Sequence, residues 1–116
     1  MSRTPNRVER AHRDRGPIVA RVICAMCQGD KTIAVVRNSS DGGLYLVFEA
    51  YRVAGKRWLD HPREWGRRTV VSAVRLQSPR SREASCPQHG PRVVTGEAVE
   101  EAAAVGTPSK PRRVVA

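Results

Sequence analysis

Two apolar segments near the start of the chain have the composition of β-strands. IVARVI at 18–23 and KTIAVVR at 31–37 are rich in β-branched side chains, which favour extended structure. The tetrapeptide CAMC lies between them, at 24–27. The pattern therefore predicts a hairpin whose tip carries two thiols.

A third segment, LYLVFEAYRV at 44–53, follows the turn NSSDGG at 38–43 and alternates apolar and polar positions with period two. Because successive side chains of a strand point to opposite faces, we expect one face to lie in the core and the other to be partly exposed to solvent. The core-facing set is Leu44, Leu46, Phe48 and Ala50, and the opposite set is Tyr45, Glu49 and Tyr51.

The following part of the chain contains shorter and more interrupted signals. Gly, Pro and charged residues at 54–68 predict a long loop, and TVVSAVRL at 69–76 predicts a strand. The polar and basic segment 77–85 is expected to be a connector. RVVT at 92–95 predicts a short exit strand.

These signals indicate one β domain with two polar ends. Residues 1–17 carry five arginines and few apolar side chains, so we expect a flexible basic arm. The β domain covers 18–95. In 96–116, EAVEEAAAV at 97–105 predicts a short helix, and a disordered tail is expected after it. The predicted fold is mainly β, with a small antiparallel sheet of about five strands, a short C-terminal helix and flexible tails.

Composition indicates a thin core and a basic cytoplasmic protein. Only 4% of the 116 residues are aromatic, and a core with so few large side chains usually needs further stabilisation by a metal ion or a disulfide. The sequence has no apolar run of membrane-spanning length and no secretory pattern, so a cytoplasmic location is expected. The net charge of +10 predicts attraction to polyanions, although the excess of arginine over lysine is also typical of a GC-rich coding bias.

Four residues in two short motifs have the spacing of a zinc site. Two residues separate Cys24 from Cys27, and two separate Cys86 from His89 in CPQHG. Pairs with this spacing at tight turns can direct both ligands toward one tetrahedral ion. A Cys3His site also explains why the cysteine count is odd. We therefore predict one structural Zn²⁺ closed by four protein ligands, with no open position for catalysis.

The two motifs and their flanking strands resemble those of zinc-ribbon domains. The resemblance rests on CAMC, CPQHG and the strand pattern over 18–95, and it implies two metal knuckles at the ends of β-hairpins. The gap of 58 residues between Cys27 and Cys86 departs from the commoner spacing of about 15–20, so the domain would be an expanded ribbon. Length and composition also resemble those of compact proteins from actinobacteria and their phages.

Two glycines agree with this interpretation. Gly29 and Gly90 follow the two motifs, where a chain reversing around a metal often needs unusual backbone angles.

The cysteines also have other possible roles. CAMC could instead be a redox dithiol, the cysteines could simply be buried, or oxidation could eject zinc in a thiol redox sensor. His61, in the predicted loop, and His12, in the arm, are not expected to be zinc ligands.

The predicted loop is also a candidate nucleic-acid site. Residues 52–68 contain six Lys or Arg, two acidic residues and both tryptophans. Cations neutralise phosphates and an exposed indole stacks on an unpaired base, although a tryptophan could instead cap the small core. Together with two connector arginines, the candidate contacts are Lys56, Arg57, Trp58, Arg63, Trp65, Arg67, Arg68, Arg80 and Arg82.

The sequence contains no recognisable catalytic motif, so neither an enzyme activity nor a small-molecule substrate is expected. The leading hypothesis is a small zinc-binding module that binds DNA or RNA through the loop, the connector and the arm. The rival hypothesis is a protein-interaction adaptor, for instance a small regulator or phage accessory protein. Such an adaptor would dock on a larger machine by a β edge or the 97–105 segment. No membrane partner is expected.

Overall fold

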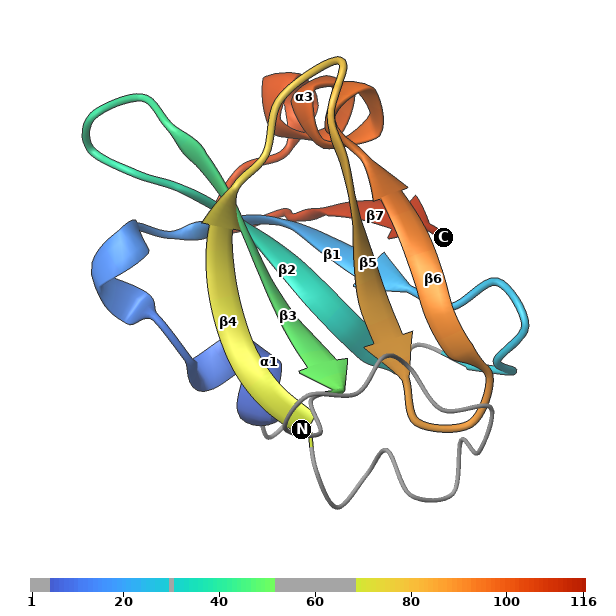
Figure 1. Ribbon diagram of the computed structural model, residues 1–116. Coiled ribbons are helices and arrows are strands. Elements are labelled where there is room, and N and C mark those ends of the chain that lie inside the picture. The colour runs from blue at the N-terminus through green and yellow to red at the C-terminus, as the bar shows by residue number, and fades with distance from the viewer. Residues whose placement is uncertain (1–4, 30, 52–68) are drawn as a thin grey trace.

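A five-stranded mixed sheet is the centre of the computed structural model, which describes residues 5–29, 31–51 and 69–116 (Figure 1). Strands β1 to β4 pair antiparallel with their sequence neighbours, whereas the last strand pairs parallel with β1. In spatial order the strands are β4 (Thr69–Arg75), β3 (Leu44–Tyr51), β2 (Thr32–Asn38), β1 (Ile18–Ile23) and β7 (Arg112–Val115).

A second layer covers one face of this sheet. It consists of the antiparallel hairpin of β5 (Ser81–Cys86) and β6 (Gly90–Thr95), followed directly by α3 (Gly96–Val105). The hairpin packs over β2 and β3, and the helix packs against β1, β6 and β7. The Thr95 hydroxyl accepts a hydrogen bond from the N–H of Ala98, which caps the helix where the strand ends.

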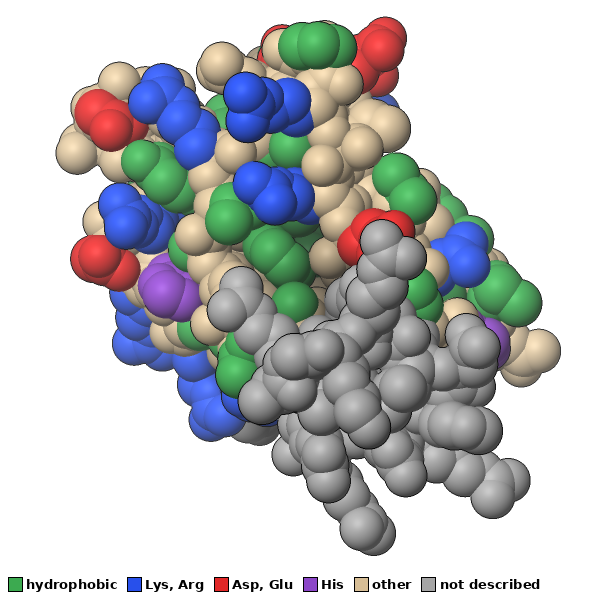
Figure 2. All heavy atoms as spheres, viewed as in Figure 1, with side chains coloured by type: hydrophobic (Ala, Val, Ile, Leu, Met, Phe, Trp, Pro, Cys, Tyr) green, Lys and Arg blue, Asp and Glu red, His purple; other side chains and the backbone are tan. Residues whose placement is uncertain are grey.

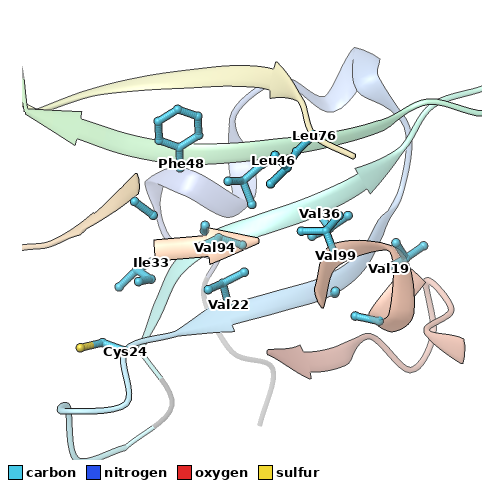
Figure 3. Packing of buried hydrophobic residues seen from close by; sticks show 14 of the residues in the cluster. Val19, Val22, Cys24, Ile33, Val36, Leu46, Phe48, Leu76, Val94 and Val99 are labelled. Atoms are coloured by element: carbon cyan, nitrogen blue, oxygen red, sulfur yellow. The ribbon is translucent and has the colours of Figure 1, made fainter. Parts of the chain in front are cut away.

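Apolar side chains between the two layers form the main core (Figure 3). Val94 of β6 and Val99 of α3 belong to the same buried cluster as Val22 and Leu46 of the sheet. The predicted core face of 44–53 is confirmed, since Leu46 and Phe48 are buried and the other two members pack at the margin of the cluster. The mainly β fold with a short C-terminal helix is likewise confirmed.

The opposite face of the sheet is covered by the N-terminal segment, where the sequence predicts a flexible arm. Residues 5–17 contain α1 (Arg7–Arg10) and the 3₁₀ helix η1 (Arg13–Arg15), and Val8 packs in a second small cluster with Val35 and Val47. One apolar residue is too weak a signal to predict this packing from sequence.

Arg37 of β2 holds this segment in place. Its side chain is buried, and its guanidinium donates three hydrogen bonds to backbone carbonyls. Nη2 donates to Glu9 at 2.6 Å, Nη1 to Gly16 at 2.7 Å and Nε to Ala11 at 3.2 Å. Burial lowers the pKa of this guanidinium, but the three carbonyl dipoles offset the loss of hydration.

Two further segments differ from the sequence expectations. The predicted connector 77–85 contains most of β5, whose first half is exposed and polar and whose second half is buried, so it has neither alternation nor an apolar run. The predicted tail contains β7, because RRVV at 112–115 pairs with β1 from a distant part of the chain. Among the described residues, no helix is both long and apolar enough to cross a membrane.

Candidate metal centre

The four predicted ligands lie in the turns of two different hairpins. Cys24 and Cys27 follow β1 in the turn toward β2, whereas Cys86 ends β5 and His89 precedes β6. Figure 1 shows the two turns side by side at one end of the two layers. Packing of the β5–β6 hairpin over the sheet therefore places its turn next to the turn between β1 and β2.

Each turn has the tight backbone that paired ligands require. The N–H of Cys27 donates to the carbonyl of Cys24 at 3.2 Å, and the N–H of His89 donates to the carbonyl of Cys86 at 3.3 Å. The prediction for Gly29 and Gly90 is confirmed, because both have positive φ, of 113° and 85°. A side chain at either position would strain the turn.

The side chains of the four residues converge on one point. Cys27 Sγ lies 3.4 Å from Cys86 Sγ, too far for a disulfide, and 3.3 Å from His89 Nδ1. The same nitrogen is 3.6 Å from Cys86 Sγ and 3.7 Å from Cys24 Sγ. All four ligand atoms lie within 4.8 Å of one another. Nδ1 is therefore the histidine nitrogen on the side of the thiols.

These separations match the edges of a tetrahedral metal site. With Zn–S of about 2.3 Å and Zn–N of about 2.0 Å, tetrahedral geometry places two sulfurs about 3.8 Å apart and a sulfur and nitrogen about 3.5 Å apart. Three soft thiolates and one imidazole are also the donors that zinc prefers. The group can therefore hold a metal ion, with Cys24 and Cys86 buried and the other two partly exposed.

The thiols differ in how readily they ionise. Burial opposes ionisation of Cys24, but hydrogen bonds from the N–H groups of Met26 and Cys27 outweigh it and lower the pKa of this thiol. Burial and the adjacent Cys86 and Cys24 thiols raise the pKa of Cys27 to about 12. Collecting three thiolates here is thus unfavourable without a cation, which a divalent metal ion would supply.

Arg92 and Ala116 form hydrogen bonds with the first knuckle. Arg92 of β6 donates through Nη1 to Met26 Sδ at 3.3 Å and through Nε to the carbonyl of Ala116 at 3.2 Å. That carbonyl also accepts from the N–H of Ala25 at 2.8 Å. The knuckle is consequently tied to the second hairpin and to the residue after β7, contacts that the sequence pattern did not indicate.

Of the predicted nucleic-acid contacts, only Arg80 and Arg82 lie within the described residues, and both lie away from the candidate metal centre. Lys56, Arg57, Trp58, Arg63, Trp65, Arg67 and Arg68 lie outside the described residues, as does His61. Arg80 and Arg82 are exposed, near the end of β5 that is remote from Cys86. His12 is exposed and precedes η1.

No protein-family model, curated protein or solved structure matches this chain. The zinc-ribbon resemblance therefore rests on the two knuckles and their hairpins alone. The geometry supports a Cys3His group capable of metal binding within a mainly β fold.

Proposed function

We propose that this chain is a small module that is stabilised by one zinc ion and binds nucleic acid without catalysis. Cys24, Cys27, Cys86 and His89 would hold the zinc. Four protein ligands leave no open coordination position, so the metal would fasten the two hairpins together rather than activate a substrate. Binding of nucleic acid would then belong to the exposed arginines.

The observation that carries this proposal is the anchored backbone of the segment that bears the N-terminal arginines. Arg10, Arg13 and Arg15 are exposed on a segment whose backbone is bound by buried Arg37. Figure 2 shows Lys and Arg side chains along the left edge of the molecule, over this segment and onward toward the upper end of β4. Cations fixed on a folded segment lose less conformational entropy on binding phosphates than a disordered arm would.

A cation–π contact connects the exposed arginines of the N-terminal segment to the side of the sheet near β4. The guanidinium carbon of Arg15 lies 4.8 Å from the centroid of the Tyr45 ring, and Tyr45 pairs in register with exposed Arg75. Asp41 lies close by, where the N–H of Gly43, with Arg75 and Arg15, lowers the pKa of its carboxyl. This ordered cluster mixes cations with an aromatic ring, a combination that suits phosphate and sugar contacts.

Arginine suits this role better than lysine. Its planar guanidinium offers paired donors that match two phosphate oxygens, and it is always charged at neutral pH. The net charge of +10 adds a long-range attraction for a polyanion. The expected binding is therefore driven by phosphate contacts and falls steeply with salt.

Fluorescence anisotropy with labelled single-stranded DNA, duplex DNA and RNA at about 50 and 200 mM salt would test this function. The test variant replaces Arg10, Arg13 and Arg15 with glutamine. The control replaces Lys110, Arg112 and Arg113 with glutamine, which removes the same charge from the opposite part of the sheet.

We expect the test variant to bind at least about tenfold more weakly at low salt, with a salt slope reduced by about 2–3 because three phosphate contacts are lost. The control should keep most of the affinity. Absence of binding to every nucleic acid at low salt, or equal losses in both variants, would contradict the proposal.

A further inference from the structure

Strand β7 leaves one side of the sheet without a partner strand in the described part of the chain. The N–H of Ala116 donates to the carbonyl of Ile23 at 2.9 Å, and its carbonyl accepts from Ala25, so both groups face β1. Because backbone groups of successive strand residues point to alternate sides, the N–H and C=O of Val115 face the outer side. An open edge of this kind is a template for another strand.

Beside this edge, a hollow of about 460 Å³ lies between α3 and β7. Its apolar lining includes Ala98, Ala102 and Val105 of the helix and Val115 of the strand. Val105 is 63% exposed and Val115 is 60% exposed. Val105 and Val115 both line this hollow, and two valines so exposed next to an open strand edge are typical of a docking surface.

The rim of this hollow is basic. Arg112 and Arg113 line it, and both also line an adjoining hollow of about 570 Å³ together with Lys110 and Val105. Glu101 is the acidic residue of the lining. Three cations against one carboxylate favour an occupant that carries negative charge.

We propose that an extended acidic segment of a protein partner adds as a strand to the outer edge of β7. Its backbone would pair with Val115, its aliphatic side chains would cover Val105 and Val115, and its carboxylates would meet the basic rim. At about 3.3 Å per residue, the four residues of β7 accommodate a segment of about four to six residues.

A second copy of this chain fits the surface less well than such a segment. Pairing of two β7 strands would bring Arg112 and Arg113 of both copies into one small interface, where like charges repel. The surface is also separate from the proposed nucleic-acid face, because residues 5–17 pack on β2 and β3 rather than on β7. The inference therefore does not depend on the proposed function.

The test is anisotropy of a labelled hexapeptide of alternating glutamate and valine, titrated with the zinc-loaded full-length protein. Val115→Pro removes the outward N–H while leaving the bonds of Ala116 to β1 in place, and proline is tolerated at such edge positions. Val105→Glu repels the peptide without touching strand pairing. The matched control is Val93→Glu, since Val93 is 58% exposed but lies on β6 and lines neither hollow.

We expect saturable binding that weakens at least tenfold in Val115→Pro and in Val105→Glu and is unchanged in Val93→Glu. A peptide of alternating lysine and valine should bind at least tenfold more weakly than the acidic one. No saturable binding, equal binding of the two peptides, or affinity unchanged in Val105→Glu would overturn the inference. A stable dimer in light scattering would also overturn it, because the edge would then be occupied by a second copy.

Discussion

The sulfur of Cys27 lies 3.4 Å from the sulfur of Cys86, although 58 residues separate the two cysteines in the chain. One belongs to the turn of the β1–β2 hairpin and the other to the β5–β6 hairpin. A metal ion bound here would therefore join the central sheet to the layer that covers it. In a chain of 116 residues with so few aromatic side chains, such a link bears directly on stability.

Replacing Cys86 by serine should remove both the metal and the folded β structure. A structural zinc ion contributes about 10 kcal/mol or more of apparent binding energy, comparable with the whole stability of a small domain. We expect zinc content to fall from one ion per chain to none, with loss of the β signal in circular dichroism. Ser85→Ala is the control, because the Ser85 hydroxyl is buried without a hydrogen-bond partner among the described residues. Its loss should be neutral or slightly stabilising.

Arg37→Met should loosen the N-terminal segment. The substitution removes the three donors to Glu9, Ala11 and Gly16, each of which is a charge-assisted hydrogen bond. We expect a loss of about 2–4 kcal/mol in urea unfolding and faster amide exchange over residues 5–17. If exchange there stayed as slow as in the native protein, Arg37 would not be what holds the segment.

Zinc binding should release protons and strengthen as pH rises. The pKa of Cys27 is raised to about 12, so this thiol keeps its proton throughout the neutral range until a metal displaces it. Release of at least one proton per ion makes the affinity rise at least about tenfold per pH unit near neutrality. Calorimetry in two buffers of different ionisation enthalpy measures the proton count, and an affinity independent of pH would be incompatible with thiolate ligation.

Arg92→Met should speed zinc release without removing a ligand. Arg92 connects Met26 in the first knuckle to the carbonyl of Ala116, and groups that support metal ligands commonly affect affinity by about 10–100-fold. We expect transfer of zinc to a chelator to be at least about tenfold faster. Arg82→Met serves as the control, since Arg82 is an exposed arginine of the same hairpin, near the end of β5 remote from Cys86. Equal release rates in the two variants would show that Arg92 does not support the knuckle.

The Cys3His group could be predicted from sequence because its chemistry is local. Cys24 with Cys27, and Cys86 with His89, each occupy one tight turn, so their spacing alone indicates the ligand geometry. The strands around them also have strong local signals, as in the alternation of 44–53. What the sequence could not supply is the path that brings the two turns together across 58 residues.

The features that escaped prediction all depend on long-range contacts. Arg37 looks like an ordinary charged residue at the end of a strand, and only the packed backbone of residues 5–17 makes it a buried anchor. β7 has a weak strand signal and is stabilised by parallel pairing with β1. β5 has no periodic pattern because its burial changes halfway along the strand. Local propensity carries little information where tertiary partners decide the structure.

Metal analysis combined with X-ray absorption at the zinc edge would show whether the Cys3His group holds a structural zinc ion. For protein purified without added metal, we expect one zinc ion per chain, with three sulfur ligands at about 2.3 Å and one nitrogen ligand at about 2.0 Å. We also expect a strong chelator to remove the ion together with the folded β structure. A well-folded protein that contains no metal, and whose thermal unfolding is unchanged by chelator, would contradict a structural zinc site.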